Sequence, residues 1–310
     1  MRITLVRHAL LPLLAAFVLA GCHGKDDPTQ PGGSTPVASV QSSVELLKKG
    51  DLAGLWKHAL PPADYATLRA DWSKRDPNQP PITEQDRARF NETLQKFTAP
   101  DAEQKLYAEL EPKLTQMEQQ YKDQLPVLIS MGDALVKRGI AQNTTLDAQQ
   151  KTQANAVVDV LAPWAQKTPW FDQAKARQAV AVAVATARQL DLKSPDELRA
   201  MDFDTAMKKY AIGYAGAKQL LAIYGLSVDD TLDSIKLSEL ENKDGHARVK
   251  IDYTLLGKPL STETAMVEVD GRWYSESMLK NARQSHQQHE DNAAAAAPAP
   301  APAGSAAHTD

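Results

Sequence analysis

The period of the apolar residues changes after Gly225, and this change restricts the chain to folds that join a helical region to a C-terminal sheet. From Leu106 to Leu128, apolar residues recur every three or four positions, as on the buried side of a helix. From Val249 to Leu255 they alternate with polar residues, which is typical of a half-buried strand. The sequence therefore predicts an α+β protein that is predominantly α-helical, with a small antiparallel sheet at its C-terminal end.

The predicted helical region spans residues 38–225. Ser194-Pro195-Asp196-Glu197 combines a capping box with proline at the first helical position, so it marks a helix start. Pro112 and Pro126 fall inside the apolar stripe and are expected to kink or divide its helix. Valine alternates with alanine from Val180 to Val184, which could indicate a strand, but the alanine content and the flanking pattern favour a helix.

Residues 226–280 are expected to form an antiparallel meander of three or four strands packed on the helices. Alternation continues from Ala265 to Val269, and Asp270-Gly271 then supplies a two-residue hairpin turn. Leu256-Gly257-Lys258-Pro259 gives the turn before it. Asp233 to Leu240 is a candidate opening strand, closed off by Asn242-Lys243-Asp244-Gly245.

Two segments of this meander carry a resemblance to known domains. VKIDYTLLGKP (249–259) and AMVEVDGRWY (265–274) resemble the sheet half of lipoprotein domains of the nuclear-transport-factor-2-like or cystatin-like type. In such families a curved sheet wraps a helix and often leaves a cavity. The resemblance implies a sheet of that kind, and it transfers no catalytic residue.

Cys22 is the only cysteine, and it directly follows Leu19-Ala20-Gly21 at the end of an apolar stretch. Residues 1–21 have the parts of a secretory signal: two arginines near the start, an apolar run and small residues at its end. The arrangement resembles the lipobox of bacterial lipoproteins. The resemblance implies cleavage between Gly21 and Cys22, and lipidation of Cys22 by diacylglyceryl and fatty-acyl groups such as palmitate.

A lipidated Cys22 would make the bilayer a partner, together with the lipoprotein processing and sorting machinery. Two or three acyl chains hold a protein stably at a membrane, whereas one holds it only marginally. Residue 23 is His, not the Asp that retains lipoproteins at the inner membrane of enteric-type bacteria. We therefore expect the periplasmic face of the outer membrane.

Both ends of the mature chain have low-complexity compositions. Residues 22–37, which include the run KDDPTQPGGSTPV, are expected to form a lipidated, flexible tether. Residues 281–310 lead through an alanine run into alternating proline and alanine, and are expected to be a disordered tail.

Composition excludes several function classes. Removal of residues 1–21 would leave 33 basic and 39 acidic residues, and this acidic balance argues against nucleic acid as a partner. Once Cys22 is lipidated, no thiol remains for catalysis, disulfides or zinc. No P-loop, dinucleotide-binding motif or zinc spacing occurs, so no cofactor is expected.

The histidines give weak signals. His58 and His246 are interpreted as ordinary surface residues, because no serine nucleophile motif accompanies them. His286 and His289 would share a helix face beside Glu290, which could attract a metal. They lead into the predicted tail, so at most adventitious binding is expected, and no metal site is predicted.

The remaining candidates are paired acids and an aromatic cluster. Asp229-Asp230 and Asp196-Glu197 are adjacent in sequence, and adjacency does not place two carboxylates across a cleft. Trp164, Trp170 and Phe171 lie near a predicted loop. Exposed rings there would form a contact surface, although packing between helices is the commoner use.

These observations lead to a membrane-anchored envelope lipoprotein that is not an enzyme and acts through contacts with another envelope protein or the cell wall. A small-ligand binding or carrier protein, with a cavity between sheet and helices, is the alternative. No catalytic residues are predicted. An enzyme of unfamiliar type is the least favoured hypothesis.

Overall fold

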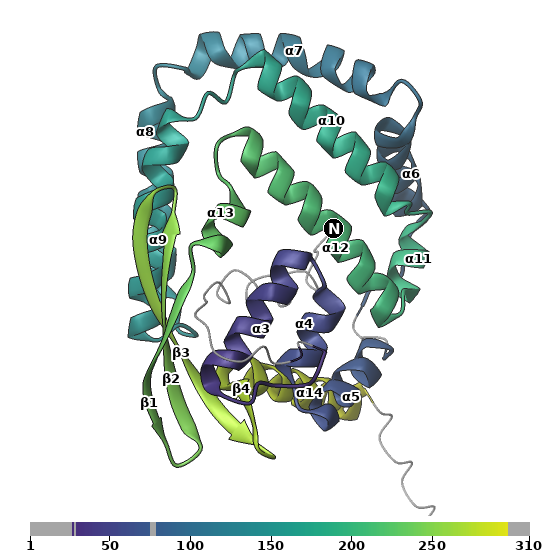
Figure 1. Cartoon of the computed structure of the whole chain (residues 1–310). Helices are drawn as coiled ribbons and strands as arrows, with labels where there is room; N and C mark the ends of the chain where they lie inside the picture. Colours follow the sequence, from purple (N-terminus) through teal and green to yellow (C-terminus); the bar gives the residue numbers. More distant parts are fainter. Residues whose placement is uncertain (1–26, 28, 75–78, 297–310) are drawn as a thin grey trace, which may run out of the picture.

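The computed structural model describes residues 27, 29–74 and 79–296, and it is mostly helical with one small sheet near its C-terminal end (Figure 1). This confirms the predicted α+β class, predominantly α-helical. The described helices and strands follow one another as α3 to α13, β1 to β4 and α14.

Three short helices begin the fold: α3 (Pro36–Lys49), α4 (Leu52–Ala59) and α5 (Pro62–Trp72). Thr35 caps α3 by accepting a hydrogen bond from the Ala38 amide. Gly50 ends α3 in the left-handed conformation at φ 70°, and Asp51 then caps α4. The tight α3–α4 corner places α3 beside the sheet and α4 against helix α12 (Phe203–Ile223) (Figure 1).

The central region contains the long helices. Their bounds are α6 (Glu84–Thr98), α7 (Ala102–Tyr121), α8 (Leu125–Gln142), α9 (Ala148–Lys167), α10 (Gln173–Leu190), α11 (Pro195–Ala200) and α12 (Phe203–Ile223). Helix α10 lies between α7 and α12 (Figure 1) and includes Val180 to Val184, so the helix prediction there is confirmed. Pro112 lies inside α7, whereas Pro126 is the second residue of α8, so the apolar stripe is divided between two helices. Ser194 caps α11 as predicted.

The sheet is an antiparallel meander in the order β1-β2-β3-β4, with β1 (Lys236–Lys243), β2 (His246–Leu255), β3 (Lys258–Val269) and β4 (Arg272–Ser275). Each hairpin turn has two residues with positive φ, and these are Asp244-Gly245, Leu256-Gly257 and Asp270-Gly271. Such turns match the twist of antiparallel strands, which is why this part of the sequence predicts the fold well. The opening strand starts later than predicted, because Ser227 caps a short helix α13 (Val228–Asp233).

The main core lies between the sheet and helices α3, α4 and α12. Its most deeply buried members are Leu232, Val249, Ile251 and Met266. On β3 it is Met266, rather than Ala265 or Val267, that enters this core, because Met266 pairs with the buried Ala247 of β2.

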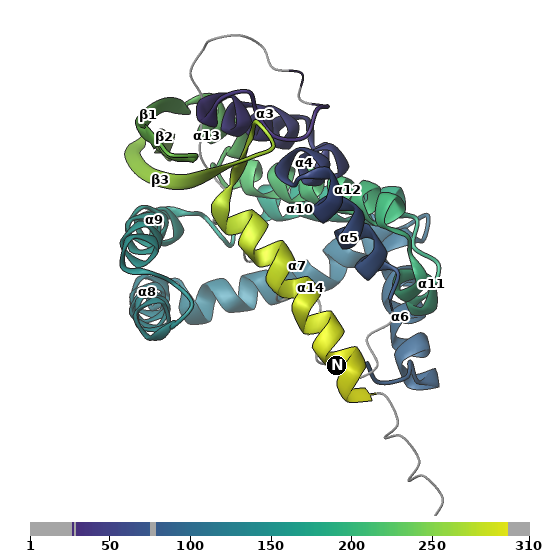
Figure 2. The same cartoon turned by 90° about the horizontal axis from the view of Figure 1, so that it is seen from below.

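The predicted disordered tail at 281–310 is wrong for residues 281–296. These belong to helix α14 (Glu276–Ala296), which packs along α5 (Figure 2). Arg283 pairs with Asp64 and His286 with Asp71, and Leu279 is buried. These contacts with a helix more than 200 residues away supply the stability that the composition alone does not indicate. Residues 297–310 lie outside the described residues.

The predicted flexible tether at 22–37 is wrong for its second half. Gly33 exchanges two backbone hydrogen bonds with Trp273, at 3.1 and 2.9 Å, and so extends the sheet beyond β4. The Arg272 guanidinium donates to the carbonyls of Pro31 and Gly32. A Cβ at Gly33 would lie 2.1 Å from the Ser39 nitrogen, so only glycine fits there. Residues 1–26, including Gly21 and Cys22, lie outside the described residues.

Candidate functional site

An exposed apolar face on helix α8 is the most distinctive surface of the described molecule. Helix α8 packs on α9, and α9 packs on β3, so α8 is the outer layer of this side (Figure 2). The side chains of Val127, Leu128, Met131 and Leu135 are between 45% and 67% exposed, and Ala134 lies exposed among them. We call these five residues the α8 apolar face.

The opposite side of α8 fixes the helix in place. Ile129 and Ile140 are half-buried on the side that packs against α9. Lys137 forms ion pairs with Asp133 on α8 and with Asp159 on α9. Because these contacts hold α8 from behind, its apolar face stays open to the outside. Contiguous exposed apolar side chains of this kind mark interaction surfaces.

Charged residues of opposite sign stand at the two ends of this face. Asp123 precedes α8 by two residues, and Arg138 lies in its last turns. Both side chains are exposed, and neither forms an ion pair with another of the described residues. Both charges are therefore free to meet a partner.

The apolar face corrects one detail of the sequence interpretation. Met117 and Leu128 belong to the stripe that predicts a buried helix side, yet they are 47% and 45% exposed. Periodicity detects an apolar side but does not tell whether the same chain covers it. The sequence signal that was overlooked is the number of apolar residues in α8, which exceeds what contact with one neighbouring helix can bury.

The aromatic cluster is half-buried rather than freely exposed. Trp164 donates its indole N–H to the Tyr224 carbonyl, and Trp170 donates to the Ala165 carbonyl. The Trp170 ring packs edge-on against Trp164, with 5.5 Å between the ring centroids, and lies tilted against Tyr224, with 5.2 Å between the centroids. The cluster, with the half-buried Phe171, joins the end of α9 to the end of α12, and its role as a contact surface stays a prediction.

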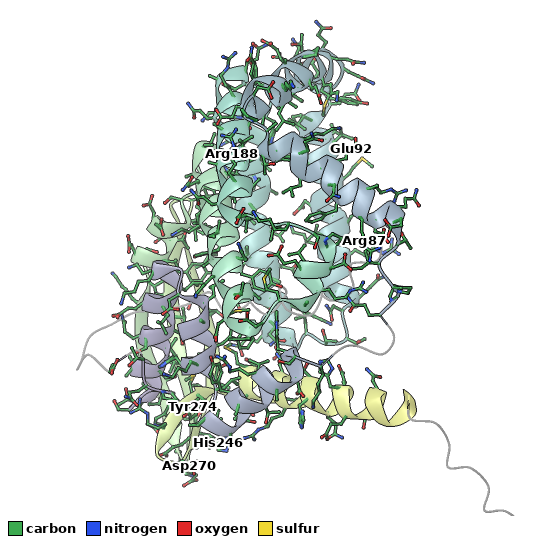
Figure 3. The ribbon with its side chains drawn as sticks, turned by 90° about the vertical axis from the view of Figure 1, so that its right-hand side faces the viewer. Arg87, Glu92, Arg188, His246, Asp270 and Tyr274 are labelled. Atoms are coloured by element: carbon green, nitrogen blue, oxygen red, sulfur yellow. The ribbon has the colours of Figure 1, made fainter. Side chains whose placement is uncertain are left out.

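The structure separates the two histidines that the sequence treats alike. The interpretation of His58 as a surface residue is wrong, because its side chain is completely buried between two backbone carbonyls. His246 is exposed at the start of β2, near Asp270 at the same end of the sheet (Figure 3). His58 is buried because residues 30–33 cross over it, a contact without a local sequence signal.

His286 makes a structural contact. Its Nδ1 lies 2.7 Å from the Asp71 carboxylate, and the Lys74 amine lies 2.6 Å from the same group. Burial raises the pKa of Asp71, but the hydrogen bonds from Lys74 and His286 outweigh it and leave the pKa below its ordinary value. His289 does not join this cluster. Within the described residues, no three His, Cys, Asp or Glu side chains converge on a point where a metal could bind.

Among the described residues, each acid pair is accounted for by a salt bridge or a helix start. Asp196 binds Arg87 through both carboxylate oxygens, and this hydrogen bonding lowers the pKa of Asp196. Asp229 pairs with Lys218, and Ser227 caps α13 by accepting a hydrogen bond from the Asp230 amide. These acids therefore connect or cap helices.

Two surface hollows lie among the described helices. One, of about 340 Å³, is lined by residues of α6, α10 and α12, including Phe97, Thr186 and Gly216. The other, of about 550 Å³, lies between α7 and α10 beside Tyr107 and Arg177. Both are open depressions between helices, away from the space between sheet and helices. Across the described part of the chain, no helix combines the length and apolarity needed to cross a membrane.

The chain matches no protein-family model, no curated protein and no solved structure.

Proposed function

We propose that this chain is a bacterial envelope lipoprotein, held by acylated Cys22 at the periplasmic face of the outer membrane, that acts through protein contacts and not through catalysis. The α8 apolar face carries the second half of this proposal, because a soluble domain rarely exposes such a series of apolar side chains without a partner. The lipobox-like sequence Leu19-Ala20-Gly21-Cys22 supports the first half, the membrane anchor.

The described N-terminal segment sets how far the domain reaches from the membrane. Gln30 is already bound to His58 through its carbonyl. Only residues 22–29 can act as a spacer, and eight extended residues reach at most about 30 Å. We therefore propose that the domain works close to the bilayer surface.

The carrier alternative receives less support. The space between the sheet and helices α3, α4 and α12 holds the buried side chains of the core, among them Val249 and Ile251. The likeness of the meander to nuclear-transport-factor-2-like domains stays a prediction.

Fractionation tests the anchor. Cys22→Ala is expected to release the chain from washed membranes, whereas the native chain should remain there and yield an acylated N-terminal peptide by mass spectrometry. His23→Asp should stay membrane-bound but move to the inner-membrane fraction of a density gradient. Retention of Cys22→Ala in washed membranes would contradict the proposed anchor.

In-cell crosslinking tests the contact role. A photoreactive residue at Met131 is expected to capture a protein in living cells, because it lies at the centre of the α8 apolar face. The same probe at the exposed Leu240, on the edge of the sheet, is the matched control. A probe at Trp170 tests the predicted aromatic surface. No capture from Met131 would remove the support for the contact role.

A further inference from the structure

The α8 apolar face is nearly symmetric about Met131. Leu128 and Ala134 lie three residues to either side of it, and Val127 and Leu135 lie four residues to either side. At 3.6 residues per turn, all four side chains fall within about 60° of Met131 around the helix axis. The face therefore presents a similar surface when the helix direction is reversed.

The charges at its ends complete this symmetry. Asp123 lies eight residues before Met131 and Arg138 seven residues after it, with opposite sign. When a second α8 is placed antiparallel, about a two-fold axis near Met131, Arg138 of the second copy comes beside Asp123. Leu135 of the second copy comes opposite Val127, and the two Met131 side chains meet at the axis.

The backbone also allows close approach. Gly132 and Gly139 flank the face, and a Cβ at either position would meet nothing within 4 Å. A second helix can therefore approach this side of α8 without a clash. A two-fold interface joins the same patch on both copies, so it requires self-complementary shape and charge.

We propose that the α8 apolar face binds a second copy of this chain, with the two α8 helices antiparallel across a two-fold axis at Met131. This inference rests on the proposed contact function, since it names the partner of that same surface. It makes two ion pairs between Asp123 and Arg138, one at each end of the interface, around an apolar centre.

The first test measures the size of the full chain, in detergent where it is membrane-bound, by light scattering after gel filtration. The native chain is expected to be a dimer, and Leu135→Glu a monomer with a dissociation constant raised about 100-fold. Leu240→Glu changes another exposed leucine, outside the face, and should leave the dimer intact. Circular dichroism melting checks that both variants remain folded.

Charge reversal tests the orientation. Asp123→Arg and Arg138→Asp each place like charges together at both ends of the dimer, and each should raise the dissociation constant about tenfold. The double variant restores opposite charges and should return close to the native value. Equal losses in the single and double variants would overturn the antiparallel pairing.

Cysteine crosslinking in washed membranes gives the geometry independently. Met131→Cys should form a disulfide-linked dimer on mild oxidation. Val127→Cys and Leu135→Cys should each stay monomeric alone but crosslink when co-expressed, because identical positions lie farther apart than a disulfide spans. The native chain, whose Cys22 is its only cysteine, is the control for crosslinks through that residue.

The outcomes separate this inference from the proposed function. A monomeric native chain, or capture of a different protein from Met131, overturns the dimer but leaves the anchor and the contact role standing. Binding of Cys22→Ala to phosphatidylethanolamine and phosphatidylglycerol vesicles, abolished by Leu135→Glu, would assign the face to the bilayer and overturn the dimer. Release of Cys22→Ala from membranes tests the anchor alone and does not bear on dimerisation.

Discussion

The Nε2 atom of His58 lies 2.8 Å from the carbonyl oxygen of Ser39, so a fully buried ring joins helices α3 and α4. Its Nδ1 atom lies 2.9 Å from the carbonyl oxygen of Gln30. Which of the two ring nitrogens donates depends on the tautomer of the ring. The Gly32 amide also donates to the His58 carbonyl at 2.8 Å. One residue thereby fixes the N-terminal segment to the helices.

His58→Leu is expected to lower the free energy of unfolding by about 2 kcal/mol, because it removes the hydrogen bonding of a completely buried ring to the Gln30 and Ser39 carbonyls. Urea unfolding followed by circular dichroism measures this change as a lower midpoint at unchanged slope. His246→Leu alters an exposed histidine and should change stability by less than about 0.5 kcal/mol. Similar stabilities for the two variants would show that the His58 contacts contribute little.

The contacts of His58 also show which features could not be predicted from the sequence. The meander was predictable because its turns are set locally, by Asp270-Gly271 and the two similar hairpin turns. The burial of His58 depends on residues 30–33 returning to β4, and the helix at 281–296 depends on α5. Neither contact leaves a periodic pattern in its own segment. The α8 apolar face was visible as an apolar stripe, but its exposure depends on which other helices cover it.

Asp71 should make stability depend on pH. Burial raises the pKa of Asp71, but hydrogen bonds from Lys74 and His286 lower it by a larger amount. The folded pKa therefore lies below the unfolded value of 3.8. The stabilisation is therefore complete above about pH 4 and is lost as the pH falls through the folded pKa. Asp71→Asn should cost about 2 kcal/mol at pH 7 and progressively less below pH 4.

Urea titrations between pH 7 and pH 2.5 measure this difference. Asp270→Asn is the control, since Asp270 is exposed in a hairpin turn and forms no ion pair among the described residues. A constant difference between Asp71→Asn and the native chain over the whole range would contradict the role of the Asp71 charge.

Two glycines of α12 should respond oppositely to alanine. A Cβ at Gly216 would lie 2.3 Å from Thr186 Oγ1, so Gly216→Ala forces α10 and α12 apart. We expect a loss of about 2 kcal/mol. A Cβ at Gly213 meets nothing within 4 Å, so Gly213→Ala gains helix propensity and about 0.8 kcal/mol. Thermal unfolding of both variants checks the pair, and the same sign of change in both would refute the packing explanation.

Tyr214 carries a buried hydroxyl that has no hydrogen-bond partner among the described residues. Burial, aided by the charge of Asp229, raises the pKa of Tyr214 to about 12. Folding removes the Tyr214 hydroxyl from water and gives it no hydrogen bond in exchange. Tyr214→Phe should therefore keep or raise stability, by up to about 1 kcal/mol. Tyr65→Phe is the matched control: the Tyr65 hydroxyl accepts a hydrogen bond from Arg69, and its removal should cost about 1 kcal/mol.

Because the pKa of Tyr214 is raised, the effect of Tyr214→Phe on stability should depend on pH in the alkaline range. A folded pKa above the unfolded value of 10 means that stability is fully present below pH 10 and falls as the pH rises toward 12. Tyr214→Phe removes this contribution, so its advantage over the native chain should grow between pH 9 and pH 11. Urea unfolding at those pH values measures it. An advantage that stays constant with pH would mean that the Tyr214 hydroxyl is solvated in solution.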